Sequence, residues 1–359
     1  MTHGPESGPA DLRLESLESF DDLRQEWAEL AERSGNIFST WEWLSTWWRH
    51  FGHEHELMLT ACRGEGNRLV AVLPLYRRTT GGMRMIRFIG HGPGDHLGPI
   101  CDPEERFEAA RALRSLLNQG NLDWNLFLAE QLPVDEGWDA LLEAQRISQT
   151  GMPLLRAGGM TWEDFLATRS ANFRQQVGRR ERNLRRLHEV RYRLAVRPDR
   201  LQADLDVLFD LHRKRWHGQT SHFSEDEAFH REFAEQAQKR GWLRLWFLEL
   251  DQEPVAAWYG FRYCGAEYFY QAGRDPRREG APGFVLFCHT IRQALQEGMR
   301  EYRLLRGDEK YKYRFANEDR RLDTLGLGRG AIGVAALAAG IAATRWRPLK
   351  TVLKGPLDL

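Results

Sequence analysis

The stretch YRLLRGDEKYKYRF, residues 302–315, concentrates side chains that can take part in acid–base chemistry. It begins as a predicted strand and then places two carboxylates, two phenols and three cations in seven consecutive positions, 308–314. Carboxylates can act as general bases, phenols and ammonium groups as proton donors, and cations can stabilise a developing negative charge. The same composition is also typical of a solvent-exposed helix start with alternating charges, so both interpretations are carried forward.

A second stretch, RDPRREGAPG at 274–283, is rich in arginine and glycine and precedes a predicted helix. Helix N-termini present unpaired N–H groups and the positive end of the helix dipole, and glycines let a phosphate approach them closely. Arg274 and Arg278 would add charge-assisted contacts. Glycines also simply make turns, so phosphate binding around Gly280 and Gly283 is a hypothesis.

The two stretches lie in the second copy of a pattern of predicted strands and helices that occurs twice along the chain. In each half, three strand-like runs separated by turn signals form a predicted antiparallel meander, followed by a loop, a helix and one further strand. In the first half, the runs are 56–63, 68–78 and 83–90, the helix is at about 103–119 and the strand is at 124–130. In the second half, the runs are 242–250, 254–264 and 267–273, the helix is at 283–298 and the strand is at 301–307. The sequence therefore predicts an α/β (α+β) protein with two related domains, each a mixed, mostly antiparallel sheet flanked by helices.

Irregular, Gly- and Pro-rich sequence around 120–160 separates the two halves. We predict domains at 1–155 and 156–330 and a C-terminal segment at 331–359. That segment begins with the apolar run AIGVAALAAGIAA, which is too short to span a bilayer, and continues with Arg345, Trp346, Arg347, Lys350 and Lys354. It is either a helix that lies at a membrane surface or an Ala-rich helix packed on a domain.

The chain has 359 residues and a formal net charge of zero, so any electrostatic specialisation must be local. Its four cysteines are far apart, and no His, Cys or carboxylate cluster has metal-ligand spacing, so we predict neither a metal site nor a disulfide framework. The N-terminus lacks the features of a signal peptide, and we expect a cytoplasmic protein.

One helical region, about 161–190, is strongly basic towards its end. Arginines dominate its second part and the residues that follow, against only two glutamates: Arg174, Arg179, Arg180, Arg182, Arg185, Arg186, Arg191 and Arg193. These cations could contact phosphates of a nucleotide, an anionic lipid surface or RNA, or form a solvated helix face.

The second half resembles the acyl-CoA-binding part of the GNAT acyltransferase superfamily. Within it, the chain is similar to the CelD/BcsL-type (BioF2-like) acetyltransferase-domain proteins, relatives of the FemAB peptidyltransferases. The matching stretches cover most of residues 37–325: TWEWLSTWWRHFG, LVAVLPLY, LHRKRW, VAAWYGFRYCGAEYFYQAGRDP and PGFVLFCHTIRQALQEGMREYRLLRGDEKYKYRF. Two departures are Arg303, where the family usually has an aspartate, and Pro282, where a free N–H would help to bind a phosphate.

The resemblance implies direct acyl transfer from acyl-CoA, a co-substrate and not a permanently bound cofactor, held between the strands EYFYQAG and EYRLLRG. It makes Asp308 and Glu309 candidate bases, Tyr311 the candidate acid and Lys312 a candidate partner of the oxyanion or of an anionic acceptor. Cofactor-binding candidates are Arg274, Arg278, Gly280, Gly283 and Phe284. Substrate-binding candidates are Asp95, His96, His212, Arg215, Trp216 and Tyr270.

The implied function is N- or O-acylation of a cell-envelope acceptor, either an amino lipid such as a sphingoid base or a polysaccharide or amino sugar. One alternative is FemAB-like transfer from aminoacyl-tRNA to a peptidoglycan precursor, in which the basic helix would contact tRNA. Another is a catalytically inactive GNAT-like scaffold. An anionic membrane surface at the inner face of the cytoplasmic membrane is a further expected partner.

Overall fold

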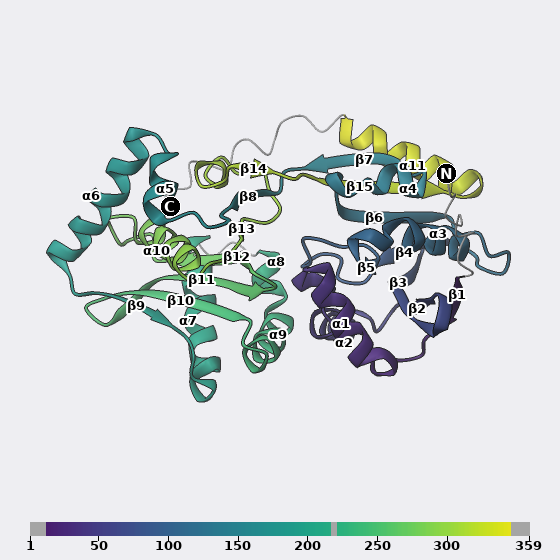
Figure 1. Cartoon of the computed structure of the whole chain (residues 1–359), viewed down its shortest axis with the longest axis horizontal. Helices are drawn as coiled ribbons and strands as arrows, with labels where there is room; N and C mark the ends of the chain where they lie inside the picture. The colour runs from purple at the N-terminus through teal and green to yellow at the C-terminus, as the bar shows by residue number, and fades with distance from the viewer. Residues whose placement is uncertain (1–11, 217–220, 346–359) are drawn as a thin grey trace, which may run out of the picture. The chain divides into compact units, whose positions relative to one another are not determined.

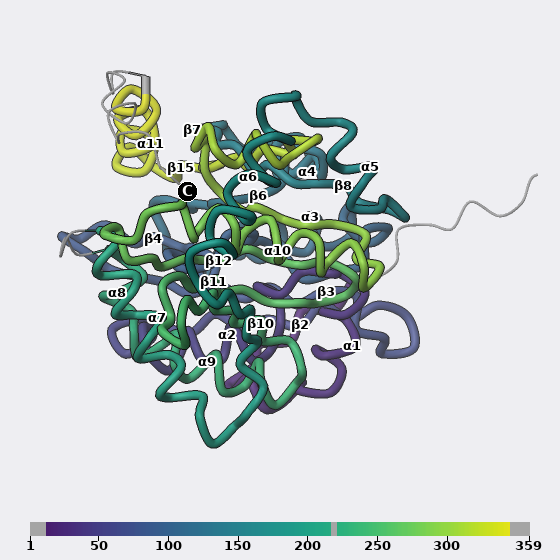
Figure 2. The backbone as a smooth tube through the Cα atoms, turned by 90° about the vertical axis from the view of Figure 1, so that its left-hand side faces the viewer, coloured from purple at the N-terminus to yellow at the C-terminus, as the bar shows by residue number. Residues whose placement is uncertain are grey.

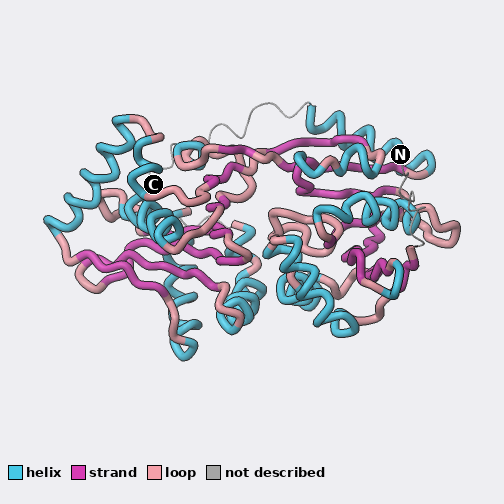
Figure 3. The backbone as a smooth tube through the Cα atoms, viewed as in Figure 1, coloured by secondary structure: helices cyan, strands magenta, loops and turns pink. Residues whose placement is uncertain are grey.

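The structure is a computed structural model that describes residues 12–216 and 221–345. The described chain forms two compact units, one made of residues up to 149 together with 322–345, the other of residues 150–321. Figure 1 shows the elements of each unit, and Figure 3 shows how helices and strands alternate along them.

The first unit is built on an eight-stranded sheet with the order β1-β2-β3-β4-β6-β15-β7, and β5 pairs with β3. Its strands are β1 (Arg13–Ser16), β2 (Glu56–Arg63), β3 (Leu69–Thr80), β4 (Met83–Phe88), β5 (Ile100–Cys101), β6 (Leu126–Pro133), β7 (Gln145–Thr150) and β15 (Leu322–Gly328). Its helices are α1 (Arg24–Ser34), α2 (Trp41–Phe51), α3 (Arg106–Leu117), α4 (Trp138–Leu142) and α11 (Gly330–Arg345).

The second unit is built on a seven-stranded sheet with the order β14-β8-β13-β12-β11-β10-β9. Its strands are β8 (Pro153–Arg156), β9 (Val190–Leu194), β10 (Leu243–Leu250), β11 (Glu253–Tyr263), β12 (Ala266–Arg274), β13 (Glu301–Arg303) and β14 (Glu318–Asp319). Its helices are α5 (Trp162–Ala167), α6 (Ala171–Leu187), α7 (Leu201–Arg215), α8 (His222–Glu225), α9 (Glu227–Lys239) and α10 (Pro282–Gln296).

The two units share the pattern that the sequence predicts. In each, an antiparallel meander (β2-β3-β4 or β10-β11-β12) is followed by a helix and by a strand that returns parallel to the last strand of the meander. The parallel pairs are β4 with β6 and β12 with β13. This confirms the predicted fold class of mixed, mostly antiparallel sheets flanked by helices.

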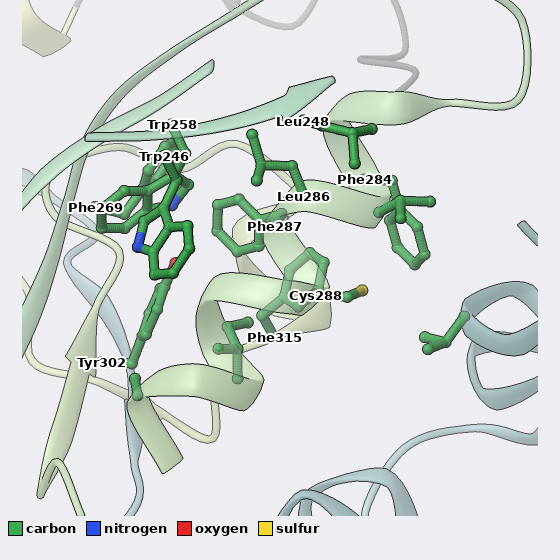
Figure 4. Close-up of a cluster of buried hydrophobic side chains, with 14 of the residues drawn as sticks. Trp246, Leu248, Trp258, Phe269, Phe284, Leu286, Phe287, Cys288, Tyr302 and Phe315 are labelled. Carbon is green, nitrogen blue, oxygen red and sulfur yellow. The ribbon is translucent and has the colours of Figure 1, made fainter. Parts of the chain in front are cut away.

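Helices cover both faces of the second sheet (Figures 1 and 2). Successive side chains of each strand point to opposite faces and so pack against one helical layer or the other. Trp246 and Leu248 of β10 lie in the aromatic core under α5, α6 and α10. Figure 4 shows this core, where Phe284 and Phe287 of α10 lie close to Phe315. The opposite face of the sheet is covered by α7 and α9. A rigid two-sided layer therefore holds the strands that carry the candidate site.

The division into units differs from the boundaries expected at 155/156 and 330/331. The chain leaves the second unit after residue 321, and β15 pairs with β6 in the first sheet. The β15 and β6 strands are some 190 residues apart in the sequence, and a local sequence pattern does not show that they pair.

The C-terminal helix α11 packs on the first unit. A Cβ added at Gly333 would lie 1.8 Å from the carbonyl oxygen of Asn125, and Leu337 contacts Gly326 closely, so glycines let the helix approach the sheet. Ile332 and Val334 remain exposed. Among the described residues, no helix has both the length and the hydrophobicity to cross a membrane. Trp346, Arg347, Lys350 and Lys354 lie outside the described residues.

One local prediction in the second unit is wrong. The helix predicted over 161–190 is broken into α5 and α6, because Ser170 adopts an extended conformation and caps α6 by accepting from the Phe173 N–H. Further along the chain, Ser221 is the N-cap of the short helix α8, and α9 follows it.

Candidate active site

The strands β12 and β13 are paired over only three residues, which leaves the rest of β12 open on that side. The parallel register joins Ala266 to Glu301 and ends where Tyr268 faces Arg303, whereas β12 continues to Arg274. On its other side, β12 has a β-bulge at Tyr270, since Tyr259 pairs with Gln271 and Gly260 with Phe269. Bulges bend a strand and redirect its side chains. The two strands therefore diverge as the resemblance implies.

Tyr311 lies close enough to Arg215, at the end of α7, for the two side chains to interact electrostatically. Arg215 also donates from Nη1 to the Ala272 carbonyl oxygen of β12 at 3.3 Å. Arg215 therefore lies between β12 and the Tyr311 phenol. Burial raises the pKa of Tyr311 above its usual value. The phenol is thus protonated at neutral pH and lies next to a cation.

The Arg215 guanidinium is only partly satisfied by the protein. Its Nε is buried and has no hydrogen-bond partner in the part of the chain that the structure describes. Burial lowers the pKa of Arg215, although an arginine remains charged at neutral pH. Glu309 and Arg274 lie close enough to act electrostatically on Arg215. This cation can stabilise a negative charge that develops beside Tyr311.

His212, which lies on α7 like Arg215, also contacts β12, and its side chain is buried. Its Nδ1 lies 3.1 Å from the Ala272 carbonyl oxygen and its Nε2 lies 2.7 Å from Ser221 Oγ. The carbonyl can only accept, so Nδ1 carries the hydrogen and Nε2 accepts from Ser221. Burial lowers the pKa of His212 to about 4, so the ring is neutral. His212 therefore joins α7, β12 and the start of α8.

Trp216 and Tyr270 are two other substrate-binding candidates. The Trp216 ring lies 6.2 Å from the His212 ring, and Tyr270 packs 5.3 Å from His230 and 6.0 Å from Tyr259. Tyr270 and Trp216 are half-buried. The structure thus brings Arg215 close to Trp216 and Tyr311, whereas Tyr270 lies in an aromatic group with His230 and Tyr259.

Lys312 points into the loop that precedes it. Its Nζ lies 2.5 Å from the Arg306 carbonyl oxygen, 3.5 Å from that of Leu305 and 3.1 Å from Glu309 Oε2, and the residue is buried. An ammonium group has three hydrogens, and these three acceptors occupy them. Lys312 therefore holds the chain between β13 and Tyr311 in place.

Asp308 fixes the same loop to the start of the second unit. It accepts from the Gly151 N–H at 3.0 Å and lies 3.3 Å from the hydroxyls of Thr150 and Tyr313. Of the predicted catalytic residues, the structure gives Lys312 and Asp308 positioning contacts and places Tyr311 close to Arg215. Glu309 is half-exposed, beside Lys312, and acts electrostatically on Tyr311.

The predicted phosphate-binding loop leads into α10. No side chain caps the first turn of this helix. The N-cap residue is Ala281, in the left-handed region with φ 55°, and Pro282 is the first helical residue. Gly283 lies against Arg274, where an added Cβ would be 3.4 Å from the arginine Cδ. The N–H groups of this turn and Arg274 can together hold an anionic group.

Other predicted residues of this loop have roles in the fold. Phe284 is fully buried, so only its backbone faces the loop, and Arg278 forms an ion pair with Glu253. Gly280 has φ 82° and packs on Leu184 of α6, 2.6 Å from an added Cβ. Sequence reasoning did not identify Arg314, whose guanidinium lies 5.5 Å from the Phe284 ring centroid at this turn. Arg180 lies over the same ring at 4.7 Å.

The remaining candidates, Asp95 and His96, belong to the first unit. Both are half-buried, His96 Nε2 lies 3.7 Å from Glu136 Oε1, and the His96 carbonyl oxygen accepts from Asn36. No cluster of three or more His, Cys, Asp or Glu side chains that could hold a metal ion occurs within residues 12–216 and 221–345. A cavity of about 720 Å³ in the second unit, lined by Trp162, Leu166 and Arg292, contains none of the predicted site residues.

Comparisons with known proteins concern the family and the fold. Residues 171–313 match the sequence profile of the family described as "Acetyltransferase (GNAT) domain". No curated protein matches the chain in sequence.

Among solved structures, FemX superimposes with a TM-score of 0.64 at 10% identity, over 91% of this chain and 100% of FemX. The C-terminal domain of an Agrobacterium fabrum protein described as a lysylphosphatidylglycerol synthetase has a TM-score of 0.54 at 12% identity, over 91% and 97%. The L-PGS of Bacillus licheniformis has a TM-score of 0.54 at 12% identity, over 89% and 95%. At such identities the likeness concerns the fold. The chain therefore contains a domain of the GNAT superfamily, which spans residues 171–313 of its second unit.

Proposed function

We propose that the protein is an acyltransferase that moves an acyl group directly from acyl-CoA to an amine or hydroxyl of a cell-envelope acceptor. The observation that carries this proposal is the Tyr311–Arg215 pair beside the open part of β12. A protonated phenol next to a buried cation suits protonation of a departing thiolate and stabilisation of a tetrahedral oxyanion.

The donor would lie along β12. Its phosphates would contact the first turn of α10 and Arg274, and its thioester would lie near Tyr270 and Tyr311. Attack by the acceptor forms the new C–N or C–O bond, and the C–S bond breaks as the thiolate takes a proton from Tyr311. Glu309 is the carboxylate near Tyr311 that can take the proton of the attacking amine or hydroxyl.

The fold neighbours support a cell-envelope acceptor. The Agrobacterium fabrum protein is named for a lipid product, lysylphosphatidylglycerol, and FemX belongs with the FemAB proteins that the sequence resembles. Between the expected acceptors, we favour an amino lipid such as a sphingoid base over an amino sugar or polysaccharide. We also propose that the protein works at the inner face of the cytoplasmic membrane.

The second candidate function is transfer from aminoacyl-tRNA to a peptidoglycan precursor. It is favoured by the fold match to FemX, which extends over the whole of that protein. The two functions differ in the donor, and a donor-binding experiment separates them.

The test is a thermal-shift titration of the full chain with CoA, acetyl-CoA and long-chain acyl-CoAs. A ligand that binds only the folded protein adds about 2.7 kcal/mol of apparent stability at 100 times its Kd. We expect a clear shift that is strongest for one chain length, and the same shift in a Tyr311→Phe variant that has lost turnover. No shift with any thioester, together with tight salt-dependent binding of aminoacyl-tRNA, would replace the proposal by the second candidate.

The expected membrane role of residues 331–359 is tested separately. The exposed Ile332 and Val334 of α11 and the cations that follow in the sequence would contact lipid. Deleting 331–359 should weaken binding to vesicles that contain anionic lipid, measured by co-sedimentation. Unchanged binding would leave packing on the first unit as the function of this segment.

A further inference from the structure

The helix α6 has two opposite faces of different chemistry. Phe173, Val177 and Leu184 are buried in the core of the second unit. Arg179, Arg182 and Arg186 are exposed. At 3.6 residues per turn, these three arginines lie within about 60° of one another around the helix and opposite the buried side chains. We call these three residues the α6 arginine row.

The other arginines of α6 have partners inside the protein. Arg185 forms an ion pair with Glu181 at 3.0 Å, and Arg174 donates to the Arg169 carbonyl oxygen at 2.5 Å. Arg180 lies over the Phe284 ring. By contrast, no hydrogen bond or ion pair connects the α6 arginine row to any other residue that the structure describes.

No acid neutralises the row from the same helix. Glu181 is the only acidic residue of α6, and it points to a flank where it contacts Arg185, Tyr192 and Arg292. The whole chain has a net charge of zero, so the row is a local excess of positive charge. Successive members rise by roughly 5 and 6 Å along the helix axis, so the row starts from backbone positions spread along one side of the helix.

This arrangement fits a surface of closely spaced phosphates, because the planar guanidinium binds phosphate through two hydrogen bonds. The residue after the row, Leu187, is 67% exposed, which makes it the most exposed large hydrophobic side chain among the described residues. A leucine next to cations suits the boundary between lipid headgroups and acyl chains, whereas RNA phosphates offer it nothing. We propose that the outer face of α6 is a docking surface for an anionic phospholipid membrane.

The proposal does not depend on which donor the enzyme uses. The contact of Phe173 with Phe284 fixes α6 on α10, and Phe173 also packs against Phe315. A membrane that docks on α6 is therefore held by the same rigid layer that carries the loop before α10. Electrostatic attraction would orient the second unit without any conformational change.

The test is co-sedimentation of the full chain with vesicles of phosphatidylcholine, with or without an equal part of phosphatidylglycerol, at low salt. A cation near an anionic leaflet contributes about fivefold to binding, so Arg179→Gln, Arg182→Gln and Arg186→Gln together should weaken it about a hundredfold. Both chains are full-length, so any contribution from α11 cancels in the ratio. Leu187→Ser alone should also weaken binding to the mixed vesicles.

A matched control carries the same charge change elsewhere, at the exposed Arg68, Arg78 and Arg200. It should bind the mixed vesicles within about twofold of the unchanged protein if the row is specific. Equal losses in both triple variants would mean that only net charge matters and would overturn the proposal. So would a triple variant of the row that binds vesicles normally and loses affinity for tRNA instead.

Discussion

Replacing Lys312 by methionine separates the two roles that its position in the sequence allows. In the structure the ammonium group contacts the Arg306 carbonyl oxygen at 2.5 Å and the Leu305 carbonyl oxygen at 3.5 Å. A hydrogen bond to a charged donor contributes about 1.5–3 kcal/mol, and a buried carbonyl left without a partner costs a comparable amount. The ion pair with Glu309 adds little, because that carboxylate is 48% exposed. We expect Lys312→Met to lower the free energy of unfolding by about 2–3 kcal/mol.

The assay is urea unfolding followed by tryptophan fluorescence, with Lys310→Met as the matched control. Lys310 is exposed, two residues away, and the same substitution there should change stability by less than about 0.5 kcal/mol. If Lys312→Met were as stable as the control but inactive, the ammonium would act on the substrate and the positioning role would be refuted. If both stability and activity fall and acyl-CoA binding survives in the folded fraction, the positioning role holds.

Three further outcomes follow from the site. Tyr311→Phe should lower kcat by about 10²–10⁴ with little effect on acyl-CoA affinity, measured as release of free CoA thiol, and an unchanged kcat would exclude the phenol as the acid. Gly280→Ala should destabilise the protein by about 1–3 kcal/mol in urea unfolding, because φ is 82° and the new Cβ meets Leu184. The pKa of His212 is lowered from 6.5 to about 4, so the unfolded chain binds the extra proton and stability should fall by up to roughly 3 kcal/mol between pH 6.5 and 4. His212→Gln should flatten that part of the stability profile, and an equal slope in both proteins would contradict this assignment.

The sequence predicts well what depends on local periodicity. The strands β10, β11 and β12 and the helix α10 lie within a few residues of their expected ranges, because turn residues such as Gly265 separate strongly apolar runs. The repeated order of meander, helix and parallel strand also follows from these runs. Each of these elements is specified by residues inside it and next to it.

What the sequence does not predict depends on distant partners. No strand was predicted after the basic helix at about 161–190, but Val190 to Leu194 form β9 and pair with β10. The strand β15 follows the second unit in sequence and joins the first sheet. Arg215 and Tyr311 interact although they are almost a hundred positions apart, and no local pattern contains this pairing.

The charged stretch 308–314 is best understood as the support of a single phenol. Asp308 fixes the stretch to Gly151, Lys312 holds the preceding carbonyls, and Arg314 donates to Gln176 of α6. These bonds satisfy polar groups that the turn would otherwise bury without partners, which is costly. Tyr311 is the member that lies close to Arg215. Residue types that look like a set of acids and bases in the sequence thus have unequal roles: Asp308, Lys312 and Arg314 fix the geometry of the stretch, and in the proposed mechanism Tyr311 is the proton donor.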